Sequence, residues 1–185
     1  MEWKISFFAL PLFLSVTSAH AVELQLAVGS SGRASSWGGD AIADVPLRLG
    51  ARFGRVFSLE LVPRAGYGTV DDRYLSAIAI QAGFWVPTKK VQPNFHFGIV
   101  HQHEEPRAGI TDIGHAIFAI GNAIRHRGGF HSSIGLDVEV DRHSWGTVTV
   151  GIDANAELYT DNRGPSLYAG AGLWLGMNFD FGGPR

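Results

Sequence analysis

Residues 167–181 alternate without interruption between apolar side chains and small or polar ones. The apolar set is Leu167, Ala169, Ala171, Leu173, Leu175, Met177, Phe179 and Phe181. A two-residue period is the pattern of a β-strand. Strands of soluble domains average about 5 to 6 residues, whereas a tilted strand that crosses a bilayer needs about 9 to 11. The length of this run therefore predicts a membrane-spanning strand.

Residues 1–21 have the pattern of a secretory signal peptide. Lys4 precedes an apolar stretch at 5–16, and the segment ends in Ala19-His20-Ala21, which suits a cleavage site. The apolar stretch is too short for a helix that spans a bilayer. We therefore expect a signal peptide at 1–21 and one mature domain at 22–185. The alternative is an uncleaved amino-terminal anchor.

The composition excludes several classes of protein. The chain has no cysteine, which rules out disulfides, thiolate metal sites and a lipid-modified cysteine. A formal net charge of −2 without a basic stripe argues against nucleic-acid binding. After the signal segment there is no run of 18 apolar residues, so only a closed barrel could cross a bilayer, because closure pairs every backbone group.

Seven further segments show the same alternation, which gives eight strands in all. They lie at 22–28, 45–53, 57–67, 78–86, 94–102, 130–141 and 147–157. Polar, glycine-rich residues predict a loop at 30–40, and residues 103–106 are expected to begin a second loop. The predicted fold is an all-β, antiparallel, up-and-down, eight-stranded transmembrane β-barrel.

The segment from Ile113 to Ile124 has two readings. If this segment were a strand, the barrel would have nine strands, whereas single-chain bacterial barrels have an even number of strands. Its isoleucines and Ala116 also recur at spacings of three and four, with Asp112 placed as an N-cap. We therefore expect a short helix within a long surface loop.

Alternation alone does not say which face of the barrel points inward. A soluble barrel would enclose the apolar face and expose the charges to water. Three features favour the membrane orientation: long strands, the pattern of the last strand, and glycines on the polar face. Small residues inside a narrow barrel would leave room for long charged side chains.

On this pattern the mature chain resembles the small bacterial outer-membrane β-barrels of the OmpA/OmpX-like size class. The specific motif is Gly176-x-x-Phe179-x-Phe181, which looks like the family's carboxyl-terminal signal for the barrel assembly machinery. The chain departs from that pattern at Trp174 and in the tail at 182–185. The resemblance implies location in the cell outer membrane, and we expect a monomer without a cofactor.

The predicted inward face carries charges of both signs. Unpaired charges in a narrow interior would cost several kcal/mol each, so we expect a packed network of ion pairs rather than an ion pathway. Glu23 also lies on this face. The predicted network comprises Arg48, Arg52, Glu60, Arg64, Asp137, Glu139, Asp153, Glu157 and Asp180.

One arrangement invites comparison with a lipid-modifying enzyme. His131, Ser133 and Glu139 resemble the His-x-Ser and Glu arrangement of the outer-membrane lipid A deacylase family. That family presents its triad to the bilayer, whereas these three residues share the predicted inward face. Ser133 and Glu139 are also about 20 Å apart along one strand. The sequence therefore favours a protein that is not an enzyme, with a deacylase as the alternative.

A second arrangement has the side chains of a metal site. His101 and His103 are two residues apart and share a strand face, so both could bind a divalent metal such as zinc. Glu104 or His115 would complete the set. The alternative is a solvated rim of polar side chains.

The run Arg125-His126-Arg127 lies on the predicted loop that begins at residues 103–106. If that loop lies outside the cell, these side chains could contact lipopolysaccharide phosphates. The sequence thus predicts a structural or surface-interaction barrel whose partners are outer-membrane lipids and lipopolysaccharide. A soluble periplasmic barrel that binds an apolar ligand is the remaining alternative.

Overall fold

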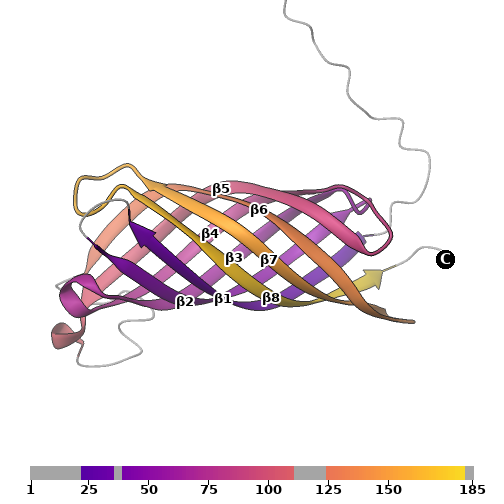
Figure 1. Ribbon diagram of the computed structural model, residues 1–185, viewed down its shortest axis with the longest axis horizontal. Helices are drawn as coiled ribbons and strands as arrows, with labels where there is room; N and C mark the ends of the chain where they lie inside the picture. The colour runs from indigo at the N-terminus through magenta and orange to yellow at the C-terminus, as the bar shows by residue number, and fades with distance from the viewer. Residues whose placement is uncertain (1–21, 36–38, 111–123, 182–185) are drawn as a thin grey trace, which may run out of the picture.

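The computed structural model describes residues 22–35, 39–110 and 124–181. They form eight strands that close into one antiparallel barrel in chain order, with β1 paired to both β2 and β8 (Figure 1). The strands are β1 Val22–Ser35, β2 Ala41–Phe53, β3 Phe57–Gly68, β4 Arg73–Trp85, β5 Val91–Pro106, β6 Arg125–His143, β7 Gly146–Tyr159 and β8 Leu167–Phe181. The predicted eight-stranded up-and-down barrel is confirmed.

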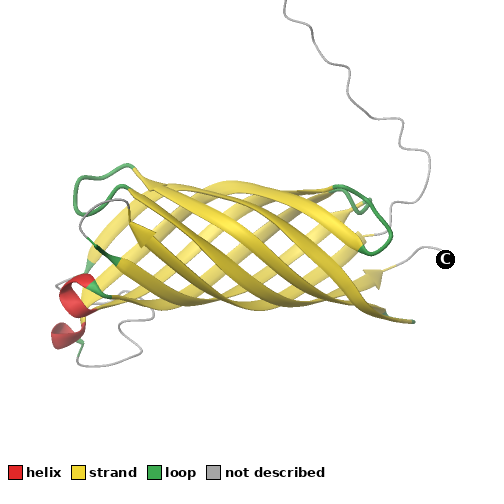
Figure 2. Ribbon diagram, viewed as in Figure 1, coloured by secondary structure: helices red, strands yellow, loops and turns green. Residues whose placement is uncertain are grey.

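Within the described residues, two short 3₁₀ helices lie at one end of the barrel (Figure 2). Helix η1 spans Val70–Asp72 and η2 spans Arg107–Gly109. Among the described residues, no helix has the length and hydropathy needed to cross a membrane. The helix expected at 113–124 lies outside the described residues, except for Ile124, which has no regular structure.

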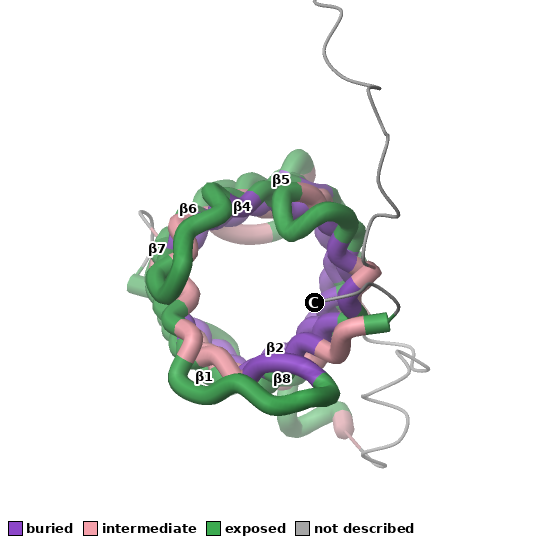
Figure 3. Tube along the Cα trace, turned by 90° about the vertical axis from the view of Figure 1, so that its right-hand side faces the viewer, coloured by how far each residue is buried: buried purple, intermediate pink, exposed green. Residues whose placement is uncertain are grey.

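The two faces of the barrel wall are chemically opposite, in the orientation that the sequence predicts. Apolar side chains point outward, with Ile134 66% and Leu173 59% exposed. Charged side chains point inward, with Arg52 3% and Glu157 0% exposed. The end-on view shows the strands closing into a single ring (Figure 3). A soluble barrel would have the reverse arrangement.

The two ends of the barrel differ in the length of their longest connections. At one end the strands are joined by 54–56, 86–90 and 144–145, and at the other by 36–40, 69–72, 107–124 and 160–166. The first strand begins and the last strand ends at the short-turn end, where Val22 pairs with Phe181. Gly54 and Arg55 both have positive φ, near 60°, as a type I′ hairpin turn requires.

Several strands extend further toward the long-connection end than the sequence predicts. Residues 30–35 were expected in a loop but belong to β1, because β8 pairs with them throughout, as in Arg33 with Gly170. Residues 103–106 belong to β5, and the run 125–127 begins β6. Serine and glycine weaken the local strand pattern, but pairing with a neighbouring strand overrides it.

Glycines on the inner face allow strands and large side chains to approach closely. A Cβ added to Gly170 would lie 2.0 Å from the carbonyl oxygen of Gly32 and 2.6 Å from Cγ of Arg33. A Cβ added to Gly50 would lie 2.8 Å from Cγ of Glu60. The small residues therefore make room for the interior charges.

Candidate functional site

The interior charges form layers that link non-neighbouring strands. At the long-connection end, Asp40 accepts hydrogen bonds from the side chains of Arg73 and Tyr168 and from the backbone N–H of Val70. Burial raises the pKa of Asp40, but the hydrogen bonds from Arg73 and Tyr168 outweigh it, so the pKa lies below its ordinary value. This carboxylate therefore ties the first connection to β4 and β8.

Glu104 lies in the same part of the interior, among three arginines. Its carboxylate is 3.2 Å from Nε of Arg73, 3.3 Å from Nη1 of Arg127 and 3.4 Å from Nη1 of Arg125. Arg127 also stacks on the Tyr159 ring, 4.3 Å from its centroid. The structure thus differs from the sequence expectation, which placed Glu104 with a metal and Arg127 on a surface loop. Both side chains are buried inside the barrel.

Glu157 is the centre of the middle layer. It forms ion pairs with Arg33 and Arg64, which reach it from β1 and β3. The Tyr159 hydroxyl donates to it at 2.8 Å, and Nδ1 of His131 lies 3.1 Å away. Arg33 also pairs with Asp44, so one arginine bridges two acids.

Glu60 is the centre of the next layer toward the short turns. Ser58 donates to it at 2.6 Å and Gln81 at 2.7 Å, while Nε of Arg48 lies 3.5 Å away. The Arg48 guanidinium stacks over Trp174, 4.1 Å from its centroid. The indole of Trp174 donates in turn to the carboxylate of Asp153.

The predicted charges nearest the short turns have different surroundings. Arg52 pairs with Glu23, and the Trp85 indole donates to Asp137 at 3.0 Å. Glu139 pairs with Arg142 where both side chains are partly exposed. Asp180 is half-buried, and its backbone N–H donates a hydrogen bond to the carbonyl oxygen of Trp145. Glu139 and Asp180 therefore belong to the barrel mouth rather than to the buried layers.

The middle of the barrel is filled. A hollow lined by Arg48, Arg64, Ser133 and Asn155, among others, has a volume of about 20 Å³. That is room for about one water molecule. At this level the side chains leave no space for a small-molecule substrate.

The residues weighed as a deacylase triad do not come together. Ser133 lies against Nδ1 of His96 at 3.2 Å, His131 against Glu157, and Glu139 against Arg142. His96 in turn lies 3.5 Å from Glu60, so Ser133, His96 and Glu60 form a row. All three are buried in the filled interior, which an ester in the bilayer could not reach. The row is part of the packing.

Sequence reasoning missed several interior residues because it ended the strands too early. Continuing the two-residue period of each predicted strand would have found them, since Arg33 keeps the face of Glu23 and Arg127 keeps the face of His131. Tyr168 was placed on the polar face, but without a partner. The residues missed in this way are Arg33, Asp44, Arg73, Glu104, Arg127 and Tyr159. Asp40 lies in a connection, where no strand period applies, and His96 lies on the polar face of the predicted strand at 94–102, without a predicted partner.

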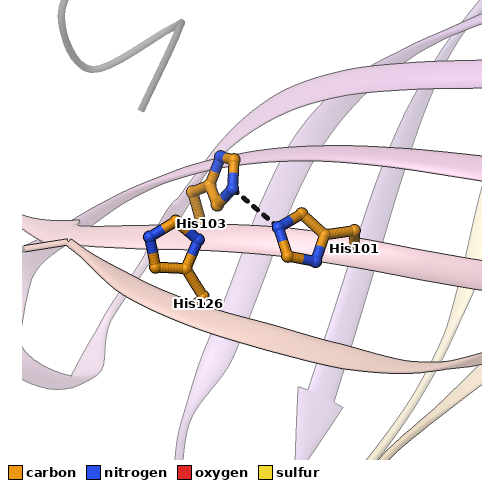
Figure 4. Close-up of side chains that lie close together, drawn as sticks. All are labelled: His101, His103 and His126. Carbon is orange, nitrogen blue, oxygen red and sulfur yellow. Dashed lines mark hydrogen bonds between the residues drawn. The ribbon is translucent and has the colours of Figure 1, made fainter. Parts of the chain in front are cut away.

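A cluster of three histidines lies on the outer face of β5 and β6 (Figure 4). His101 and His103 project from β5, and His126 projects from β6 directly opposite His103 in the register. The cluster contains His101 and His103 of the predicted metal set. Glu104 points to the opposite face of β5, and His115 lies outside the described residues.

Comparison with known proteins identifies the fold. No family model matches the chain, and no curated protein matches it. Neisserial surface protein A (NspA) is 16% identical with a TM-score of 0.60, and the match covers 86% of this chain and 97% of that one.

Two further solved barrels match at lower TM-scores. Ail of Yersinia pestis, in complex with the heparin analogue sucrose octasulfate, is 14% identical with a TM-score of 0.46, covering 89% of this chain and all of that one. The outer membrane enzyme PagL is 12% identical with a TM-score of 0.47, covering 83% and 97%. At these identities the likeness is one of fold, and the chain is an eight-stranded β-barrel of the kind found in bacterial outer-membrane proteins.

Proposed function

We propose that this protein is an outer-membrane anchor that presents its long connections at the cell surface. The observation that carries the proposal is the apolar belt around a closed, charged interior. Exposed side chains such as Ile80, Phe97, Ile134 and Leu173 circle the barrel. A belt of this kind is stable against lipid and unfavourable in water. The fold shared with NspA supports the same location.

The filled interior supports a structural role rather than transport. Ion pairs cross-link β1, β2, β3, β4, β5, β6 and β7 in the buried layers. Removing one partner of a buried pair costs about 3 to 5 kcal/mol, so these layers hold the strand register firmly. A stiff body of this kind suits a scaffold for surface loops.

The surface end is assigned from the length of the connections. Outer-membrane barrels have short periplasmic turns and longer extracellular loops. The two longest connections, 107–124 and 160–166, lie at the same end of the barrel, so by this rule that end faces outward from the cell. Arg107 and Arg163 are exposed there and Arg125 is partly exposed. These arginines, rather than the buried Arg127, are the groups for contacts with lipopolysaccharide phosphates.

Export and assembly complete the proposal. Residues 1–21 act as a cleaved signal peptide, and residues 22–185 form the mature monomer. The barrel assembly machinery recognises the end of β8 through Gly176, Phe179 and Phe181. In support, Phe181 is 57% exposed on the outer face, where a partner can reach it.

Single-cysteine labelling tests both location and orientation, because the natural chain has no cysteine. An Arg163→Cys variant is expected to react with a membrane-impermeant maleimide on intact cells. The matched Lys89→Cys variant, in a short turn, is expected to react only after lysis. Cell fractionation of the same variants should recover both in the outer membrane. Recovery in the soluble fraction, or labelling of Lys89→Cys alone on intact cells, would refute the proposal.

A further inference from the structure

The three histidines on the outer face have surroundings unlike those of the other described histidines. His96, His131 and His143 each lie within 3.5 Å of a carboxylate, on Glu60, Glu157 and Asp141 respectively. Within the described residues, no such ion pair is found for the clustered histidines. Their rings contact one another instead.

The position of the cluster follows from strand register. His103 and His126 are directly opposite each other on β5 and β6, and His101 shares the face of His103 two residues along. Ring centroids are 4.6 Å apart for His101 and His103 and 4.6 Å for His103 and His126. The backbone of two paired strands therefore holds the three imidazoles together.

The spacing of the ring nitrogens suits a transition-metal ion. One nitrogen from each ring lies within 4.8 Å of the others. Tetrahedral zinc with Zn–N bonds of 2.0–2.1 Å needs nitrogens about 3.3 Å apart. Because the histidines already point toward one another (Figure 4), side-chain rotation alone could bring them to that spacing.

The contact between His101 and His103 supports the same conclusion. Their Nε2 atoms are 2.8 Å apart, a hydrogen-bond distance. A hydrogen bond between two imidazole nitrogens requires one of them to be unprotonated, since a nitrogen that carries a proton can only donate. A lone pair is therefore directed into the cluster, and the neutral imidazole nitrogen is the form that binds a metal.

The surroundings leave one side of the cluster open. His101 and His126 are exposed, and His103 is partly buried. The cluster lies just beyond the exposed apolar side chains of Ile99 and Phe130, on the side of the long connections. A three-histidine site of this kind leaves a fourth coordination position for water, as in catalytic zinc sites.

We propose that His101, His103 and His126 bind one divalent transition-metal ion of the zinc class on the outer rim of the barrel. The ion fastens β5 to β6 at the base of the 107–124 connection. The sequence analysis placed Glu104 in this site, but the Glu104 side chain points to the barrel interior. His126, from the next strand, takes its place in the set. This site goes beyond the anchoring function and does not depend on it.

The test measures zinc binding to the full chain extracted from membranes in detergent, without a polyhistidine tag. Equilibrium dialysis is expected to show one zinc per barrel. His126→Ala and His101→Ala should each weaken binding by more than about tenfold, since even loss of a residue that supports a metal ligand costs about that much. His143→Ala removes an exposed histidine near the short turns and is the matched control, with unchanged binding.

Folding of each variant is checked by heat-dependent migration on a detergent gel. A second measurement needs no variant: Co²⁺ added to the natural chain should give the visible absorption bands of a tetrahedral site, and zinc should abolish them. Absence of stoichiometric zinc binding, or equal binding by His126→Ala and the natural chain, would overturn the proposal.

Discussion

The hydroxyl of Tyr168 on β8 donates a hydrogen bond to Asp40 in the first connection, with an oxygen–oxygen distance of 2.6 Å. The two residues are far apart in the sequence, and neither is exposed by more than 1%. Arg73 pairs with the same carboxylate from β4. Asp40 therefore ties the connection between β1 and β2 to β4 and β8 at the long-connection end.

Replacing Tyr168 with phenylalanine is expected to lower the free energy of unfolding by about 1 to 3 kcal/mol. The ring remains, but a buried carboxylate loses a donor. Urea unfolding of the barrel in detergent, followed by tryptophan fluorescence, measures the change. A Tyr67→Phe variant is the control, because its hydroxyl bonds to Asp72 at an exposed site. Equal losses in the two variants would contradict the role given to Asp40.

Asp40 also predicts a dependence of stability on pH. Its pKa is lower in the folded protein than its ordinary value of about 3.9. Such a group stabilises the fold above its unfolded pKa, and that contribution is lost as the pH falls through the folded pKa. We expect Asp40→Asn to be less stable than the natural chain at pH 7, with the gap narrowing below about pH 4. A gap that stays constant between pH 7 and pH 3 would count against this assignment.

The buried layers and the barrel mouth should respond differently to loss of an acid. Glu157→Gln leaves Arg33 and Arg64 without their shared carboxylate and should cost about 3 to 5 kcal/mol. Glu139→Gln breaks a partly exposed pair with Arg142 and should cost about 0 to 1 kcal/mol. Urea unfolding of the two variants side by side gives both values. The ranking fails if Glu139→Gln is the more damaging change.

Two glycines on paired strands give a test of close packing. Gly170→Ala places a Cβ 2.0 Å from the carbonyl oxygen of Gly32, so we expect a smaller fraction of folded barrel after refolding. Gly32→Ala meets nothing within 4 Å and should fold as the natural chain does. The fraction of barrel that shows heat-dependent migration after refolding measures the difference. Similar yields from both variants would argue against tight packing at Gly170.

The two-residue period predicted the strands of the barrel, whereas the strand count also needed the even number of single-chain bacterial barrels, and the orientation of the faces needed the strand lengths and the glycines on the polar face. Ser133 and Ile134 illustrate the reason, since adjacent residues on a strand point to opposite sides. Strand ends were predicted less well, because residues 30–35 have the composition of a loop and are held by pairing with β8.

The partners within the interior could not be predicted from the sequence. Arg33 and Arg64 meet Glu157 only because the barrel closes, and no local pattern encodes that closure. The histidine cluster has the same cause. His126 faces His103 through the register of β5 and β6, which is set across the 107–124 connection. Spacing along one strand therefore identified His101 and His103 but not their third member.

The central claim is that the apolar belt contacts lipid. A nitroxide attached to Ile134→Cys, with the protein reconstituted in liposomes, tests it most directly. Because Ile134 is 66% exposed in the middle of the belt, we expect strong relaxation of the label by oxygen and weak relaxation by a water-soluble nickel chelate. Strong relaxation by the nickel chelate, with little effect of oxygen, would show that this surface faces water and would contradict the account.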